Sequence, residues 1–133
     1  MTTEVRNPLI LCVDDERSGL LMRRLLLESQ GYRVLTAENG SDGISILAAE
    51  AVDLVLLDYA MPGADGAAVA EKMKKIKSSI PIIMLSAYID LPSETFVHVD
   101  RYVLKGQSPV SLLTAVAELL KSGSTGFSHP PAP

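Results

Sequence analysis

Polar or charged residues stand directly after four short apolar runs of this chain, and together they suggest one chemical site. In chain order they are Asp14, Asp15, Glu16, Asp58, Ser86 and Lys105. If the apolar runs are parallel strands, their carboxyl ends share one edge of a sheet, which is where such folds bind ligands. Carboxylates, a hydroxyl and an ammonium group then meet at that edge, and carboxylate oxygens suit a hard metal cation.

Three aspartates in one place, Asp14, Asp15 and Asp58, repel one another. Two unit charges about 5 Å apart cost about 3 kcal/mol at an effective dielectric of about 20. Three such pairs approach about 10 kcal/mol, the whole stability of a small domain. A divalent cation offsets this repulsion, and all-oxygen ligands favour Mg²⁺ over Zn²⁺. The simpler alternative is that Asp14 and Asp15 only stabilise the start of a helix and that Asp58 is an ordinary residue at a strand end.

Five apolar runs alternate with stretches of helical periodicity along the chain. The runs are 9–13, 32–35, 54–57, 81–85 and 102–104. Three of them are apolar at nearly every position, which is typical of strands covered by helices on both faces. The alternation predicts an α/β fold, a doubly wound parallel sheet of five strands flanked by helices.

The helical stretches differ in clarity. The first predicts a buried stripe of Leu20, Leu21, Leu25 and Leu27. The segment 88–100 contains a proline and a weak pattern, so the fourth helix is expected to be shortened or irregular. A run of lysines, which we interpret as a solvated helix end, lies in the third helix. Its members are Lys72, Lys74, Lys75 and Lys77.

Composition sets the broad class of the protein. The chain has 133 residues, 47% of them hydrophobic, and we expect a single domain over 1–121 followed by a flexible Gly/Ser/Pro-rich tail over 122–133. A net charge of −4 leaves no basic field for direct nucleic-acid binding. A single cysteine excludes an internal disulfide. No apolar run is long enough for a membrane span and no signal peptide is visible, so we expect a cytoplasmic protein without membrane contact.

These motifs, taken in order, resemble the receiver domain of two-component response regulators, the CheY-like family, over about residues 8–121. The matching residues are Asp14-Asp15, Asp58, Met61-Pro62-Gly63, Asp65-Gly66, Ser86-Ala87, Tyr102 and Lys105. The resemblance implies a flavodoxin-like fold with strand order 2-1-3-4-5. It also implies Mg²⁺ as cofactor, a sensor histidine kinase or phosphotransfer protein as phosphodonor, and an unknown downstream protein as receiver of the signal.

The resemblance also implies a role for each residue. Asp58 accepts the phosphoryl group, Asp15 and Asp58 bind Mg²⁺ directly, Asp14 binds it mostly through water, and the backbone carbonyl of Ala60 adds a ligand. Of the remaining residues, Ser86 bonds a phosphoryl oxygen, Lys105 pairs with the phosphoryl group, and Tyr102 changes rotamer with Ser86 as the switch. The sequence departs from the family at Gly106, where proline is common, so we expect a looser loop after Lys105.

Other α/β proteins fit less well. A flavin binder of this topology needs a phosphate-binding loop after the first strand, where this chain has acids. A phosphatase with an aspartate nucleophile needs a second acid two residues after Asp58, where Ala60 stands. We therefore predict a phosphoacceptor domain that acts as a binding switch and not as a metabolic enzyme. The alternative is a receiver-fold interaction module that works without phosphorylation.

Overall fold

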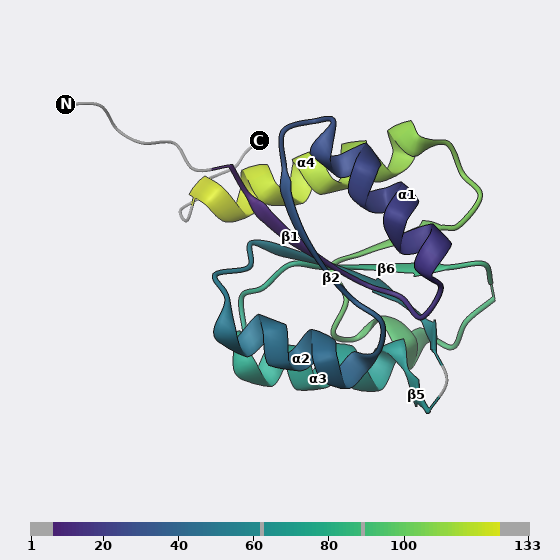
Figure 1. Cartoon of the computed structure of the whole chain (residues 1–133). Coiled ribbons are helices and arrows are strands. Elements are labelled where there is room, and N and C mark those ends of the chain that lie inside the picture. Colours follow the sequence, from purple (N-terminus) through teal and green to yellow (C-terminus); the bar gives the residue numbers. More distant parts are fainter. Residues whose placement is uncertain (1–6, 62, 89, 126–133) are drawn as a thin grey trace, which may run out of the picture.

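The central element is one sheet of five parallel strands (Figure 1). The computed structural model describes residues 7–61, 63–88 and 90–125. The strands are β1 (Leu9–Val13), β2 (Arg33–Ala37), β3 (Leu54–Asp58), β6 (Ile82–Ser86) and β7 (Arg101–Leu104). Their order is β2-β1-β3-β6-β7 and every neighbouring pair is parallel. Counting the sheet strands alone, this is the predicted order 2-1-3-4-5, and the predicted fold class is confirmed.

Helices cover both faces of the sheet. They are α1 (Arg17–Glu28), α2 (Gly40–Ala49), α3 (Gly66–Ile76) and α4 (Pro109–Thr125). The first and last of these lie on one face, and α2 and α3 lie on the other (Figure 1). Along β1, Leu9, Leu11 and Val13 pack towards α2 and α3, while Ile10 and Cys12 pack towards α1 and α4. Because alternate residues of a strand point to opposite faces, a strand buried on both faces must be apolar throughout.

Two irregular segments adjoin the carboxyl edge of the sheet. The short strands β4 (Ala60–Met61) and β5 (Ala64–Asp65) pair antiparallel outside the main sheet. Between β6 and β7 the chain forms only a 3₁₀ helix, η1 (Ser93–Phe96), among the residues described there. The prediction of a shortened or irregular fourth helix is therefore confirmed.

The buried stripe of α1 differs from the prediction. Leu20 and Leu27 are buried, but Leu21 and Leu25 are 55% and 53% exposed. With 3.6 residues per turn, the positions that share a face with Leu20 are three, four and seven residues further on. The position three residues after Leu20 is Arg23, a charged residue whose side chain is only 16% exposed. The helix thus turns an arginine, and not Leu21 or Leu25, towards the interior.

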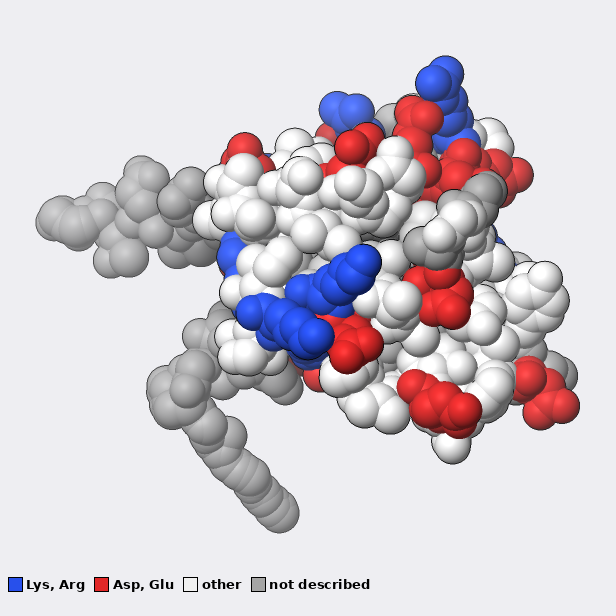
Figure 2. All heavy atoms as spheres, turned by 90° about the horizontal axis from the view of Figure 1, so that it is seen from below, with Lys and Arg blue, Asp and Glu red and all other residues white. Residues whose placement is uncertain are grey.

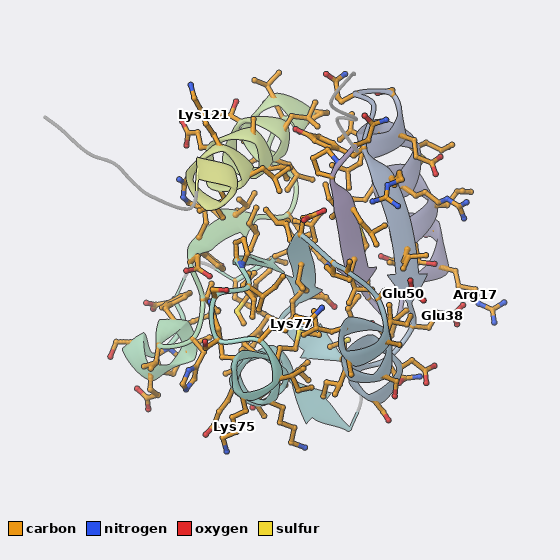
Figure 3. All side chains as sticks on the ribbon, turned by 90° about the vertical axis from the view of Figure 1, so that its left-hand side faces the viewer. Arg17, Glu38, Glu50, Lys75, Lys77 and Lys121 are labelled. Carbon is orange, nitrogen blue, oxygen red and sulfur yellow. The ribbon has the colours of Figure 1, made fainter. Side chains whose placement is uncertain are left out.

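The lysine run of α3 is only partly a solvated surface. Seen from the side of α2 and α3, basic side chains gather near the middle of the face with acidic side chains beside them, and other basic side chains lie along its upper edge (Figure 2). Lys75 is 74% exposed and points away from the helix (Figure 3). Lys74 is only 19% exposed, and its ammonium group lies 2.8 Å from an oxygen of Asp100 and 2.6 Å from the carbonyl oxygen of Ile80. The interpretation of this run as solvated was therefore wrong for Lys74, which ties α3 to the segments that enter β6 and β7.

Replacing Lys74 with methionine is expected to lower the free energy of unfolding by about 1 to 2 kcal/mol. The loss of the ammonium group leaves the Ile80 carbonyl without this donor and removes the cation from Asp100, which also accepts the N–H of Ile82 at 2.8 Å. Urea denaturation measures the change. Lys75→Met is the matched control, since its exposed ion pair is worth less than about 1 kcal/mol. Equal stabilities of the two variants would contradict the prediction.

Helix α4 continues to Thr125 and so includes 122–125, the first part of the segment 122–133 that was predicted to be a flexible tail. The remainder of the predicted flexible tail, 126–133, lies outside the described residues. Among the residues that the structure describes, no helix combines the length and the apolar character that crossing a membrane requires.

Candidate functional site

The strand ends bring the predicted acids together at one edge of the sheet. Asp58 is the last residue of β3, and Asp14 directly follows β1, its neighbour in the sheet. Asp14 and Asp58 are 1% and 3% exposed, whereas Asp15 is exposed to solvent. One carboxylate oxygen from each of the three aspartates lies within 4.8 Å of the others. The predicted proximity of Asp14, Asp15 and Asp58 is thus what the structure shows.

These residues line a cleft of about 440 Å³. Its walls are formed by Asp14, Asp15, Glu16, Asp58, Ala60, Ser86, Ala87, Tyr88 and Lys105. Every strand-end residue predicted from the sequence is in this set, and so is Ala60. The predicted switch residue, Tyr102, is not among the lining residues and lies on β7.

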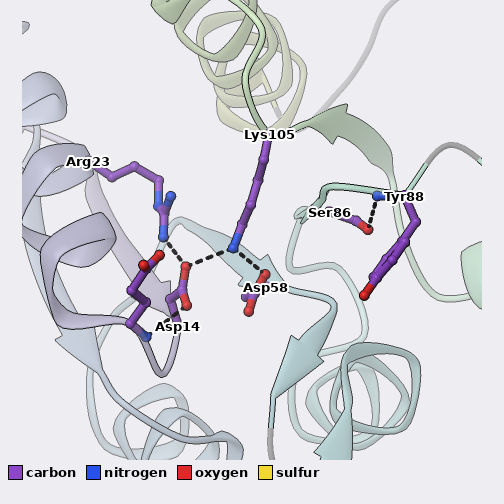
Figure 4. A network of polar contacts seen from close by, with 7 residues as sticks. Asp14, Arg23, Asp58, Ser86, Tyr88 and Lys105 are labelled. Carbon is purple, nitrogen blue, oxygen red and sulfur yellow. Dashed lines mark hydrogen bonds and ion pairs between the residues drawn. The ribbon is translucent and has the colours of Figure 1, made fainter.

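Lys105 lies between the two buried aspartates (Figure 4). Its ammonium nitrogen is 2.8 Å from an oxygen of Asp58 and 3.3 Å from an oxygen of Asp14. The backbone N–H of Lys105 donates to the carbonyl of Ser86 at 2.8 Å, which fixes the strand end from which the side chain extends. The next residue, Gly106, has a φ of +91°, a left-handed conformation that proline cannot adopt. The ammonium group of Lys105 thus contacts both aspartates although glycine and not proline follows it, and the looser loop expected after Lys105 stays a prediction.

The two buried carboxyl groups have opposite electrostatic tendencies. Burial raises the pKa of Asp58 above its ordinary value, and the hydrogen bond and charge of Lys105 offset this only in part. Burial also acts to raise the pKa of Asp14, but the N–H of Glu16 and the charges of Arg23 and Lys105 hold that pKa below its ordinary value. Asp14 is thus held as an anion, whereas ionised Asp58 is the costly member of the pair.

A second cation, which the sequence interpretation missed, also contacts the site. Arg23 of α1 forms an ion pair with Asp14 (Figure 4). The sequence does contain a signal for it, because Arg23 lies three residues after Leu20 and four before Leu27, on the helix face that these two buried leucines share. A charged residue at a position where the helical period requires an apolar one indicates a buried partner of opposite charge.

The loop after β6 connects Ser86 with Tyr102. The hydroxyl of Ser86 accepts the backbone N–H of Tyr88 at 2.9 Å, and the hydroxyl of Tyr102 donates to the backbone carbonyl of the same residue. The ring of Tyr102 packs edge-on against Phe96 of η1, with ring centres 5.1 Å apart. Both residues with predicted switch roles thus contact the backbone of Tyr88, Ser86 at its N–H and Tyr102 at its carbonyl.

Asp58 also depends on a close backbone approach at the start of α3. The N–H of Gly66 donates to the carbonyl of Tyr59 at 2.7 Å, and Asp65 caps the helix by accepting the N–H of Ala68 at 2.9 Å. A Cβ atom on Gly66 would lie 2.8 Å from the Cα of Tyr59 and 2.9 Å from the carbonyl oxygen of Asp58. The helix start can therefore lie against the end of β3 only because residue 66 has no side chain.

Comparisons with known proteins agree with this geometry. The response regulator receiver domain family matches residues 10–117. A probable transcriptional regulator, ycf27, of Cyanophora paradoxa is 39% identical over 124 residues, which are 89% of this chain and 50% of the relative. The sensor protein GacS of Pseudomonas syringae pv. syringae is 40% identical over 88 residues, 62% of this chain and 10% of GacS. The chain thus spans half or less of the length of these curated relatives.

Solved structures are similar over nearly the whole chain. A CheY-like receiver domain protein from Methanospirillum hungatei JF-1 has a TM-score of 0.85 and 28% identity, covering 92% of this chain and 100% of that one. The response regulator TrrA from Thermotoga maritima, solved in complex with Mg²⁺-BeF, has a TM-score of 0.80 and 35% identity. That comparison covers 84% of this chain and 98% of TrrA.

Proposed function

The chain belongs to the response regulator receiver domain family, and we propose that it is a phosphoacceptor whose switch is the transfer of a phosphoryl group to Asp58. The observation that carries the proposal is the cluster of three carboxylates within 4.8 Å of one another, with the ammonium group of Lys105 2.8 Å from Asp58. One buried carboxylate in a cleft, beside a cation and two further acids, is the arrangement that metal-assisted phosphoryl transfer requires.

The donor is a phosphohistidine of a sensor histidine kinase or phosphotransfer protein. A carboxylate oxygen of Asp58 attacks phosphorus, the P–N bond to the imidazole breaks, and the imidazole nitrogen keeps the electron pair. Asp15 and Asp58 would hold Mg²⁺ directly, Asp14 would hold it mostly through water, and the carbonyl of Ala60 would complete the protein ligands. Held there, the cation would supply positive charge beside the transferring phosphoryl group. Lys105 then pairs with the phosphoryl oxygens in place of the Asp58 carboxylate.

The signal leaves the site through Ser86 and Tyr102. Phosphorylation adds negative charge and oxygens that need hydrogen-bond donors. When the hydroxyl of Ser86 turns to a phosphoryl oxygen, it no longer accepts the N–H of Tyr88. The loop around Tyr88 is then held only by the hydrogen bond from Tyr102 to the Tyr88 carbonyl, and it becomes free to move. The domain thereby changes a protein-binding surface for a downstream partner, as a binding switch and not as a metabolic enzyme.

Phosphoryl uptake is tested by weighing the intact protein. After incubation with Mg²⁺ and a small phosphodonor such as acetyl phosphate, we expect a gain of about 80 Da, the mass of one phosphoryl group. Asp58→Asn is the matched control, since it keeps the size of the side chain and removes the acceptor oxygen, and it should gain nothing. Chelation of Mg²⁺ should abolish the gain of the wild-type protein. If the wild-type protein gains no mass, the alternative of an interaction module that works without phosphorylation is favoured.

A further inference from the structure

Arg23 is a charged side chain of the polar network to which the proposed phosphoryl transfer gives no role. Its guanidinium group pairs with the Oδ2 atom of Asp14, the same oxygen that Lys105 approaches at 3.3 Å. The Oδ1 atom of Asp14 accepts the N–H of Glu16 at 3.0 Å. Both oxygens of Asp14 thus have protein partners within the site itself.

The local structure of α1 directs Arg23 into this position. Long side chains on a helix run back towards its N-terminus, and here that direction leads from Arg23 past Gly19 to Asp14. A Cβ atom on Gly19 would lie 3.2 Å from a guanidinium nitrogen of Arg23, so a larger side chain at that position would crowd the guanidinium group. The arginine side chain is 16% exposed and its partner carboxylate 1%, so water screens the pair only weakly.

We propose that Arg23 is an internal counter-ion that competes with Mg²⁺ for Asp14 and so weakens the affinity of this domain for the metal. The inference rests on the proposed function, which places Mg²⁺ among the same three aspartates. When the metal binds, Arg23 either leaves Asp14 and loses its ion pair, or stays and repels a divalent cation at short range. Both outcomes oppose metal binding. Without the metal, the same contact stabilises the fold by neutralising a buried carboxylate.

The competition has a signature that a purely structural role lacks. Replacing Arg23 with methionine keeps most of the length of the side chain and removes its charge. The metal-free variant should be less stable than wild type, because Asp14 loses a cation. It should nevertheless bind Mg²⁺ about tenfold more tightly, because one positive charge close to the metal is gone. Loss of packing alone would lower the stability of the protein and would not increase its affinity for Mg²⁺.

The experiment titrates metal-free protein with MgCl₂ in a calorimeter and measures melting temperatures at each metal concentration. Arg24→Met is the matched control, since the neighbouring Arg24 is 50% exposed and pairs with Glu28 at 3.1 Å, away from the site. It should bind Mg²⁺ like the wild-type protein. Arg23→Gln, a second neutral variant that keeps polar character, should also tighten Mg²⁺ binding and serves if the methionine variant does not fold.

The outcomes separate this inference from the proposed function. Tighter binding by both Arg23 variants, with Arg24→Met unchanged, supports the competition. Equal or weaker binding by the Arg23 variants, while the wild-type protein binds Mg²⁺, overturns the role of Arg23 and leaves the proposed metal site intact. If none of these proteins binds Mg²⁺ at millimolar concentrations, the proposed metal site itself is wrong, and the inference fails with it.

Discussion

Replacing Lys105 with methionine is expected to slow phosphoryl uptake by Asp58 at least about a hundredfold, the usual effect of removing one preorganised charge from a transition state. It should also lower the free energy of unfolding at neutral pH by about 2 kcal/mol. The ammonium group lies 2.8 Å from Asp58 and 3.3 Å from Asp14, so its removal leaves two buried carboxylates without a shared cation. The stability figure is below that of a fully buried pair because the side chain of Lys105 is 30% exposed.

The loss of stability should depend on pH with a definite sign. Burial already raises the pKa of Asp58, so this group stabilises the fold when protonated, and its contribution falls as the pH rises through that raised pKa. Without Lys105 the pKa of Asp58 rises further. The difference between wild type and Lys105→Met should therefore be largest at neutral pH and shrink as the pH falls through the carboxyl range.

Denaturation with urea between pH 4 and pH 8 (a range of about four units) measures this difference, and intact mass against time measures uptake. Lys72→Met provides the control, because Lys72 is exposed on α3 and the change in net charge is the same. Its stability should stay within about 0.5 kcal/mol of wild type at every pH. A stability difference for Lys105→Met that does not shrink in acid would show that Lys105 acts through packing and not through its charge.

Gly66 does not line the cleft, but replacing it with alanine is expected to change the geometry of the site strongly. The added Cβ atom meets the backbone of Tyr59 and Asp58 at 2.8 and 2.9 Å, and backbone atoms cannot rotate away as side-chain ends do. We expect a loss of about 2 to 3 kcal/mol in stability. Since the end of β3 must shift, the carboxylate of Asp58 should move relative to Lys105, and phosphoryl uptake should slow about tenfold or more.

Gly31→Ala is the control for this prediction. Gly31 has a φ of +92°, and no heavy atom lies within 4 Å of the position that its Cβ would take. Alanine there should cost about 1 kcal/mol of backbone strain and leave uptake unchanged. If Gly66→Ala takes up phosphate at the wild-type rate, the close approach of α3 to β3 does not position Asp58.

The chain's own patterns were sufficient to predict the fold and the acidic cluster. A continuous apolar run such as 9–13 is buried on both sides only when helices cover both faces of the sheet. Parallel strands then place their carboxyl ends at the same edge of that sheet. Asp14, Asp58 and Ser86 stand one residue after such runs or at their ends, so their meeting follows from topology. The weak apolar pattern over 88–100 likewise predicted the irregular segment that contains η1.

The partners of these residues depended on the three-dimensional packing. Arg23 and Lys74 are charged residues in helices. A helical pattern predicts the face of the helix on which each one lies, but it does not predict which carboxylate each one contacts. Asp14 is nine positions from Arg23 in the chain, and Asp100 is in a segment without regular structure. Such pairs form because long, flexible side chains reach the nearest opposite charge once folding has brought the elements together. The order of residues in the sequence determines which face of an element each side chain lies on and whether it is buried. The distances between side chains of different elements are determined only by the tertiary structure.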